Sequence, residues 1–430
     1  MRDTLSSVLG RIWTSPRIGD DFAQLAACGG RFAGTESEAR AREFLAGRIA
    51  EATGAPVTRE PVSYRGWTRG PASIAVAERP PFPAVGLVRT PGTPPHGLSA
   101  RLIDLGRGTP EDITRAAEAV RGAIVLARHE FMMAEDHVHR RRKYDAARAA
   151  GAAGFVIAFH APGCLSVTGS SGDGGPGHIP AVGVSFETAA ALSAHAGRDV
   201  TLRTSGAFAD AVAENLVAAI PGRDQKRVVL SAHYDGHDQA ASAIDNASGV
   251  AAAIAAAEAL SDVVPTLPRG LELALFSVEE WALIGSRVHL DRLDARARAE
   301  IACNVNLDSV AGDATLTAIT GGFPGVAEFV RRALEPTGLA VGLHHGFMAN
   351  SDHANFVRHG IPAFRLCAGF AKPESNLRFL LTAADTPDKV RLTELKTAAS
   401  IAAALVLAAC TDPALPAPIA AAEGRRIAGF

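Results

Sequence analysis

Between residues 215 and 409 the chain alternates between two hydrophobic patterns. Short runs rich in apolar residues have the length of buried strands: 227–231, 271–276, 301–307 and 362–367. Longer stretches between and after them have the length and residue composition of helices: 248–260, 283–293, 323–335 and 388–409. Strands that alternate with helices predict an α/β fold, with a mostly parallel sheet and helices on both of its faces.

The N-terminal region is predicted to be helical over its first 65 residues. Within it, residues 36–52 carry Leu45 and Ile49 at helical spacing. Thr35 or Ser37 can cap the start of this helix, because a side-chain oxygen there can accept a hydrogen bond from a free backbone N–H.

A second, smaller α/β pattern lies between these two regions. Prolines and glycines accumulate over 65–96, which indicates a domain boundary or short edge strands. Strand-like runs then surround a helical stretch at 144–152, at these positions: 122–128, 154–158 and 179–184. This module has no obvious catalytic cluster. The tail after Pro413 is rich in Ala and Pro and is expected to be loosely ordered.

The composition narrows the classes of partner and compartment. The chain has 43 Lys and Arg against 45 Asp and Glu, so its net charge of −2 argues against nucleic acid or an anionic membrane as a partner. We expect no transmembrane helix and no secretory signal, because no strongly apolar run is long enough. The five cysteines are scattered, which predicts neither disulfides nor a thiolate zinc site and favours the cytoplasm.

Residues suited to metal binding follow the predicted strands. His233 comes after the run at 227–231, Glu279 and Glu280 come after the next run, and Asp308 follows the third. Asp245 stands just before the helix that follows the first of these strands. Because ligands bind outside the carboxyl ends of strands in open α/β sheets, we expect these side chains to meet at one edge.

This residue set favours metal-assisted hydrolysis. Buried carboxylates are costly unless they are paired or bound to a metal, and one imidazole with Asp, Glu and Asp suits Zn²⁺, with Mn²⁺ or Co²⁺ as alternatives. Glu279 and Glu280 are expected on opposite faces of an extended strand end, so one can bind metal while the other takes a proton from water. Asp235 could reach back to the other nitrogen of His233 and fix its tautomer.

Other chemistries fit the sequence less well. A single His-x-Asp or Glu-Glu pair is more often part of a solvated surface, so the prediction depends on the three strand ends and the helix start together. The Gly-rich segment 169–177 lacks the Lys-Ser/Thr of a phosphate loop, and Ser231 has no nucleophile-elbow context.

The order and context of the candidate residues resemble one family. The matching segments are His233-Tyr-Asp235, Asp245-Asn-Ala-Ser-Gly, Phe276-Ser-Val-Glu279-Glu280, Asn306-Leu-Asp308 and Ser351-Asp352-His353. They are similar to the co-catalytic zinc exopeptidases, which include bacterial zinc aminopeptidases, glutamate carboxypeptidases and animal glutaminyl cyclases. The match covers most of 206–409, and residues 76–205 resemble the protease-associated domain that is often inserted in this family. The resemblance therefore implies a discontinuous catalytic domain of residues 1–75 and 206–430, interrupted by an inserted domain of residues 76–205.

The resemblance also implies a set of metal ligands. His233 and Asp308 would hold one metal ion, Asp245 would bridge two ions, and Glu280 would hold the second.

Further roles follow from the same resemblance. Glu279 would be the general base, and Asp235 would orient the imidazole of His233. Asp352 and His353 would contact the substrate or support the site.

One position departs from the family's pattern. There, a His ligand of the second metal precedes a Thr-x-x-Asp-Thr stretch, whereas here Leu381 precedes Thr382-Ala-Ala-Asp385-Thr386. No later histidine can serve, because the last one in the chain is His359. The second ion is then lost, weakly held or bound through another histidine, for which the candidates are His137, His139, His237, His344, His345 and His353.

Three functions remain open at this point. The first is a metal-dependent hydrolase of C–N bonds, most simply an aminopeptidase or related exopeptidase, in which Glu279 is the base. The second is a cytoplasmic amidohydrolase or aminohydrolase that acts on a small non-peptide amide or amine. The third is a non-catalytic binding module on the same fold, which the retention of both base and ligands argues against. The substrate would be a peptide or small molecule, and the resemblance is compatible with a homo-oligomer.

Overall fold

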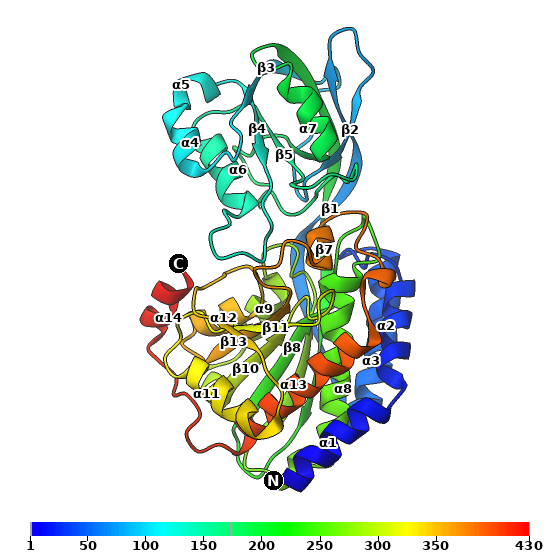
Figure 1. Cartoon of the computed structure of the whole chain (residues 1–430), viewed down its shortest axis with the longest axis vertical. Helices are drawn as coiled ribbons and strands as arrows, with labels where there is room; N and C mark the ends of the chain where they lie inside the picture. The colour runs from blue at the N-terminus through cyan, green and yellow to red at the C-terminus, as the bar shows by residue number, and fades with distance from the viewer. Residues whose placement is uncertain (1, 173, 430) are drawn as a thin grey trace. The chain divides into compact units, whose positions relative to one another are not determined.

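The computed structural model describes residues 2–172 and 174–429, which form two compact units (Figure 1). The larger unit comprises Met1–Tyr64, Val212–Leu380 and Asp385–Phe430, and the smaller one comprises Arg65–Ala211 and Leu381–Ala384. The domain boundaries expected from the sequence, after residues 75 and 205, fall inside two long strands, β1 (Val57–Val76) and β7 (Asp199–Ile220), which pair with each other. Those boundaries stay a prediction.

The larger unit is a sheet with helices packed on it. Beside the C-terminal part of β7, its strands are β8 (Arg227–His233), β9 (Gly270–Phe276), β10 (Ile301–Leu307), β11 (Leu316–Ile319), β12 (Gly342–His344) and β13 (Ala363–Ala368). Its helices are α1 (Arg2–Thr14), α2 (Arg17–Ala27), α3 (Glu36–Thr53), α8 (Gly249–Leu260), α9 (Ile284–Arg292), α10 (Ala295–Ala299), α11 (Val326–Leu334), α12 (His353–Arg358), α13 (Leu392–Thr411) and α14 (Ala421–Ala428). Short helical turns lie at η1 (Ala243–Ser248), η2 (Val264–Thr266), η3 (Glu335–Thr337), η4 (Asn376–Phe379) and η5 (Pro387–Lys389).

The centre of this sheet is parallel and wholly buried. The strand order is β7-β9-β8-β10-β13-β11-β12, in which β9, β8, β10 and β13 pair in parallel. The outer strands β7 and β11 are antiparallel to their inner neighbours. All residues of β9 and β10 are buried, as expected for parallel strands covered on both faces.

Helices cover the two faces of these strands. Figure 1 shows α8 and α13 against one side of β8 and β10, with α9 and α12 on the other side. By length and composition α13 could cross a membrane, with a mean hydropathy of 1.5. However, 67% of that stretch is buried inside the protein, where α13 packs on α8, so its apolar character is accounted for by the core.

The smaller unit has its own sheet and core. Its elements are β2 (Phe82–Gly86), β3 (Leu98–Asp104), α4 (Pro110–Arg115), α5 (Ala117–Val120), β4 (Ile124–Arg128), α6 (Arg140–Ala149), β5 (Gly154–Ala158), β6 (Ala181–Val184) and α7 (Phe186–Ser193). Strands β3, β4, β5 and β6 pair in parallel, while β2 and the N-terminal part of β7 are antiparallel at the edges. Apolar side chains from these strands, including Ile124, Leu126 and Val156, form a continuous buried cluster.

Most expected elements are present, with two corrections. Helix α3 begins where the spacing predicts, and Thr35 caps it by accepting a hydrogen bond from the N–H of Glu38. The expectation of helix through residue 65 is wrong, because β1 begins at Val57, where polar and apolar residues alternate. The expectation of a loosely ordered tail is also wrong over α14, which packs against α12.

Candidate metal centre

The parallel register of the larger sheet brings the candidate residues to one edge. His233 is the last residue of β8 and lies opposite Phe276, the last residue of β9. Asn306 in β10 lies opposite Ser231 in β8, so Asp308, just beyond β10, emerges beside His233. The strand ends therefore supply a buried imidazole and a carboxylate to a common point.

His233, Asp245 and Asp308 form a compact cluster. The Nε2 atom of His233 lies 3.2 Å from Asp245 Oδ1 and 3.7 Å from Asp308 Oδ1. In the described part of the chain this is the one group of three such side chains whose ligand atoms all lie within 4.8 Å of one another. Ligands at about 2.0–2.1 Å from a tetrahedral zinc ion are separated by about 3.3 Å, so the spacing suits a metal.

The other ring nitrogen of His233 fixes which atom faces the carboxylates. Nδ1 lies 3.1 Å from the backbone carbonyl of Asp235, which can only accept a hydrogen bond. Nδ1 must then carry a proton, and Nε2 can present its lone pair to a metal. The carboxylate of Asp235 is farther away, at 3.7 Å, so the predicted orientation of His233 comes mainly from the Asp235 backbone.

Carboxylates dominate the electrostatics of His233. Burial lowers the pKa of its imidazole, but the charge of Glu279 and the contacts with Asp235, Asp245 and Asp308 outweigh burial and raise it well above its usual value. Without a metal ion the cluster therefore favours a protonated His233, and a metal ion would have to displace that proton.

Asp308 is paired with a buried arginine. Arg365 Nη2 lies 3.2 Å from Asp308 Oδ1, and the Arg365 side chain is 2% exposed. Its Nε and Nη2 also donate to the backbone carbonyl of Asp308, both at 3.3 Å. Although burial raises the pKa of Asp308, the charges of Arg365 and His233 lower it well below its usual range, so Asp308 stays ionised.

Asp245 is held by its backbone. It lies in η1, where Asp245 and Asn246 depart from helical geometry. The carboxylate of Asp385 accepts hydrogen bonds from the N–H groups of Ile244, at 2.7 Å, and Asp245, at 3.2 Å. Asp385 therefore fixes the segment from which the Asp245 side chain reaches His233.

Glu279 and Glu280 lie in a turn, which corrects the expectation of an extended strand end. Strand β9 ends at Phe276, and Val278 has a φ of 59°. The carboxylate of Asp235 accepts hydrogen bonds from the N–H groups of Glu279, at 3.1 Å, and Glu280, at 3.3 Å. Asp235 thus links the two glutamates to the strand end that carries His233.

The two glutamates have different surroundings. Glu279 is buried, and burial together with the charges of Glu280, Asp352 and Asp308 raises its pKa well above its usual value, against the effect of His233. Such a carboxylate takes up a proton more readily than an exposed one.

Glu280 lies against a histidine that the sequence offered as one of several candidates. Its Oε2 is 2.7 Å from Nε2 of His237, which is 4% exposed. Burial lowers the pKa of His237, but the charge of Glu280 outweighs burial and raises it.

Two family models match parts of this chain. The model of peptidase family M28 matches residues 215–406, and the model of the PA domain matches residues 87–192. The segment 215–406 belongs to peptidase family M28. The resemblance inferred from the motifs is thereby confirmed, including the inserted PA domain.

Relatives of this chain include aminopeptidases. Leucine aminopeptidase 2 of Trichophyton equinum is 29% identical over 237 residues, which is 51% of this chain and 47% of that protein. The chain thus spans about half the length of such curated relatives. Among solved structures, a peptidase M28 precursor of Shewanella amazonensis superposes with a TM-score of 0.78 at 21% identity, covering 97% of this chain and 98% of the other. A zinc aminopeptidase of Bacillus subtilis gives 0.73 at 24% identity, covering 94% and 97%. These likenesses confirm the predicted α/β fold with its inserted domain.

Asp352 and His353 lie at the start of α12. Both side chains are buried, at 0% and 1% exposure. Burial and the charges of Asp235 and Asp308 raise the pKa of Asp352 to about 7. Burial and the charge of Arg365 lower the pKa of His353 to about 3, so this ring is neutral, and it packs 5.5 Å from the ring of Phe347. Covered side chains suit a supporting role better than direct contact with substrate.

The other candidate histidines make contacts of their own. The ring of His344 in β12 packs 4.5 Å from that of Phe370. His137 and His139 belong to the smaller unit, where their ring centres lie 6.3 Å apart. Leu381 also groups with the smaller unit, and its carbonyl accepts a hydrogen bond from Thr168.

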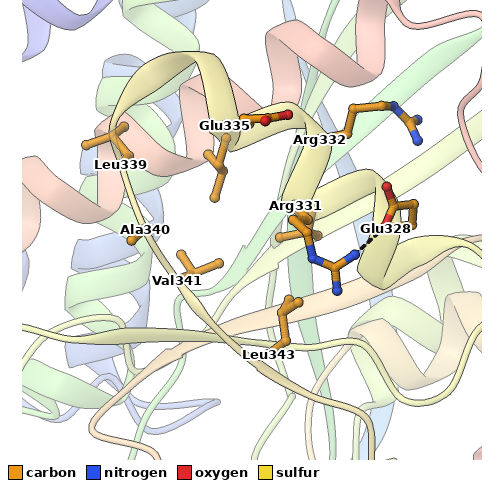
Figure 2. A pocket seen from close by; sticks show the side chains of 10 residues that line it. Glu328, Arg331, Arg332, Glu335, Leu339, Ala340, Val341 and Leu343 are labelled. Atoms are coloured by element: carbon orange, nitrogen blue, oxygen red, sulfur yellow. Dashed lines mark hydrogen bonds and ion pairs between the residues drawn. The ribbon is translucent and has the colours of Figure 1, made fainter.

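A surface pocket of about 550 Å³ lies elsewhere in the larger unit. It is formed by α11, η3 and the segment that leads into β12, as Figure 2 shows. Glu328 and Arg331 form an ion pair on its wall, and Leu339 and Leu343 supply apolar lining. None of its lining residues belongs to the metal centre.

Three residues of the centre were not assigned a role from the sequence. Arg365 lies within an ordinary strand pattern. Asp385 lies in the Thr382–Thr386 stretch, which the sequence related only to the histidine missing at Leu381. Arg31 is fully buried and donates to the carbonyls of Tyr234, at 2.8 Å, and Ser242, at 2.7 Å, which holds the loop after β8 in place. In the sequence, the signal available for Arg31 was the Gly30-Arg31 pair in the loop that leads into α3.

Proposed function

We propose that this protein is a metal-dependent aminopeptidase that hydrolyses the N-terminal peptide bond of its substrate. The observation that carries the proposal is the cluster of His233, Asp245 and Asp308 with the buried carboxylate of Glu279 beside it. Membership in family M28 supports the same reaction class, because its relatives include aminopeptidases.

The residues present fit a zinc ion. His233 Nε2 and one oxygen each from Asp245 and Asp308 would hold it, since their spacing matches the edge of a tetrahedron. With Nδ1 bonded to the Asp235 carbonyl, Nε2 is the nitrogen that would give up its proton and face the ion. Bound there, zinc acts as a Lewis acid that polarises a carbonyl group and lowers the pKa of water. Arg365 keeps Asp308 ionised and therefore ready to bind a cation.

Glu279 is the residue that moves the proton. Its buried carboxylate accepts a proton from the water molecule that attacks the peptide carbonyl, and then delivers that proton to the amine nitrogen as the C–N bond breaks. Its raised pKa helps it to hold the proton between these two steps. Asp235 positions Glu279 through the backbone hydrogen bond to its N–H group.

The proposal is tested by measuring zinc content and peptidase activity on the same preparation. We expect the purified protein to bind at least one equivalent of zinc and to hydrolyse leucine p-nitroanilide. Chelation with EDTA should abolish the activity, and added zinc should restore it. The matched control is N-acetyl-leucine p-nitroanilide, which has the same scissile bond but a blocked amine.

The outcomes separate the three candidate functions. Cleavage of the free-amine substrate alone supports an aminopeptidase. Cleavage only of small non-peptide amides would favour the amidohydrolase alternative. Zinc binding without hydrolysis of any of these amides would favour the binding module. We also propose a cytoplasmic location and self-association, which cell fractionation and light scattering would test.

A further inference from the structure

The pair formed by His237 and Glu280 lies outside the cluster of His233, Asp245 and Asp308. His237 Nε2 and Glu280 Oε2 approach to 2.7 Å, and both side chains are largely buried. Yet three buried atoms here form no hydrogen bond of normal geometry: both ring nitrogens of His237, and Oε1 of Glu280. Buried polar atoms in proteins almost always have partners, so three such atoms at one place point to a ligand.

The backbone holds His237 firmly at this position. Its N–H donates to Ser242 Oγ at 2.9 Å. A side chain at Gly30 would meet the carbonyl oxygen of His237 at 2.0 Å, and one at Gly236 would meet Ser242 Cβ at 2.6 Å. Only glycine permits this close packing. Together with Arg31, which binds the carbonyls on both sides, the glycines place the His237 ring beside Glu280.

A second buried His–Glu contact in the same unit shows what a purely structural pair looks like. His289 Nδ1 lies 3.1 Å from both carboxylate oxygens of Glu60, which also accepts from Asn215 Nδ2. On its other side His289 faces Glu272, which is paired with Arg227 at 2.8 Å. Each of those glutamates accepts from a further side chain, Asn215 for Glu60 and Arg227 for Glu272, although Glu272 Oε1 and His289 Nε2 also lack a hydrogen bond of normal geometry. Among the described residues, Glu280 Oε1 has no hydrogen-bond donor.

We propose that His237 and Glu280, together with Asp245, hold a second metal ion, and that His237 supplies the imidazole that Leu381 cannot. The inference rests on the proposed function, because Asp245 would be shared with the ion at His233. An imidazole and two carboxylates form a ligand set that suits Zn²⁺. Around a tetrahedral ion the His237 and Glu280 ligand atoms would move apart from 2.7 Å to about 3.3 Å. The spacing of this pair is therefore close to what binding requires. The carboxylate of Asp245 would have to move closer to the pair, because among the described residues only the His233 cluster brings three ligand atoms within 4.8 Å of one another.

The charge of the region favours a second cation. Four carboxylates gather here, those of Asp245, Glu279, Glu280 and Asp308, and Arg365 pairs with only the last of them. The buried like charges of Asp245 and Glu280 repel each other. A divalent ion between them removes that repulsion.

The test compares the zinc stoichiometry of three full-length proteins by isothermal titration calorimetry and elemental analysis. We expect two equivalents in the wild type and one in His237→Ala, with affinity at the second site reduced at least about a hundredfold. The control is His289→Gln, which removes a buried imidazole from a His–Glu contact whose glutamates are paired with Asn215 and Arg227. It should bind two equivalents. Co²⁺ absorption spectra provide a second readout, because the spectrum of the second equivalent should be lost only in the His237 variant.

Each result is decisive. If His237→Ala binds two equivalents with unchanged affinity, or if the wild type binds only one, the second site as proposed is wrong while the proposed function survives. If the wild type binds none, both proposals fail. Should His237→Ala fail to fold, His237→Asn keeps a polar side chain of similar reach but a much poorer zinc ligand, and it carries the same expectation.

Discussion

Replacing Arg365 with methionine should make the stability of the protein depend strongly on zinc. The substitution keeps an unbranched apolar side chain but removes the guanidinium that contacts Asp308 at 3.2 Å. Asp308 would then be a buried carboxylate next to Asp245 and Glu279, with no permanent positive charge beside it. A zinc ion bound at His233 would supply that charge, so the loss should be severe without metal and smaller with it.

The size of the effect follows from the burial of the pair. Removing one partner of a buried ion pair costs about 3–5 kcal/mol, because the remaining charge stays buried and uncompensated. For a unit of this size that corresponds to a fall in melting temperature of roughly 6–15 °C. If zinc recovers about 2 kcal/mol of this loss, linkage requires zinc to bind the variant about thirtyfold more tightly than the wild type.

Thermal unfolding in EDTA and at saturating zinc, together with zinc titration calorimetry, measures both sides of this cycle. The matched control is Arg48→Met, which breaks a buried ion pair with Asp21 (2.9 Å) away from the centre. Its destabilisation should be the same with and without zinc. The reasoning is refuted if Arg365→Met loses equal stability in both conditions, or if its zinc affinity falls.

Three further results are expected. His233→Ala should lower the zinc affinity of the first site at least about a hundredfold, as measured by calorimetry. In the wild type, zinc binding should release protons and become tighter as the pH rises, because the carboxylates raise the pKa of His233. Glu279→Gln should retain folding and zinc content but reduce turnover on a confirmed substrate by about 10²–10⁴; a variant that keeps most of its turnover would exclude Glu279 as the base. His289 should give a pH-dependent stability: burial lowers its pKa, but Glu272 and Glu60 outweigh burial and raise it to about 9 from an unfolded value near 6.5. This contribution, on the order of 3 kcal/mol, is fully present below pH 6.5 and lost as the pH rises through 9. Urea unfolding between pH 6 and 10 should show that decline in the wild type, and a His289→Gln variant with the same pH profile would contradict it.

The sequence predicted those elements whose character is local. Strands β8, β9 and β10 are short apolar runs, and the helices between them show their spacing or alanine content, so both could be placed to within a few residues. The long strand β1 was missed because it contains Pro61, Gly70 and Pro71, and because many of its residues are exposed or only half-buried. Its partners come from distant parts of the chain, and only their pairing makes the segment a strand.

The site shows the same division. His233, Asp245, Glu279, Glu280 and Asp308 could be named from the sequence, because the carboxyl ends of parallel strands must share an edge and because their order matches a family. These predictions depended on neighbours in the sequence and on one rule of topology.

What the sequence alone could not determine is which distant groups surround those residues. Arg365 meets Asp308 because β10 and β13 pair with Asn306 opposite Arg365, a register that no local pattern reveals. Asp385 reaches the backbone of Asp245 across 140 residues, and His237 meets Glu280 because a loop is folded over Gly30. Hydrophobic periodicity reports which side of an element is buried, whereas the partner of a buried charge is decided by packing between elements. The electrostatics of the centre therefore belong to the tertiary structure.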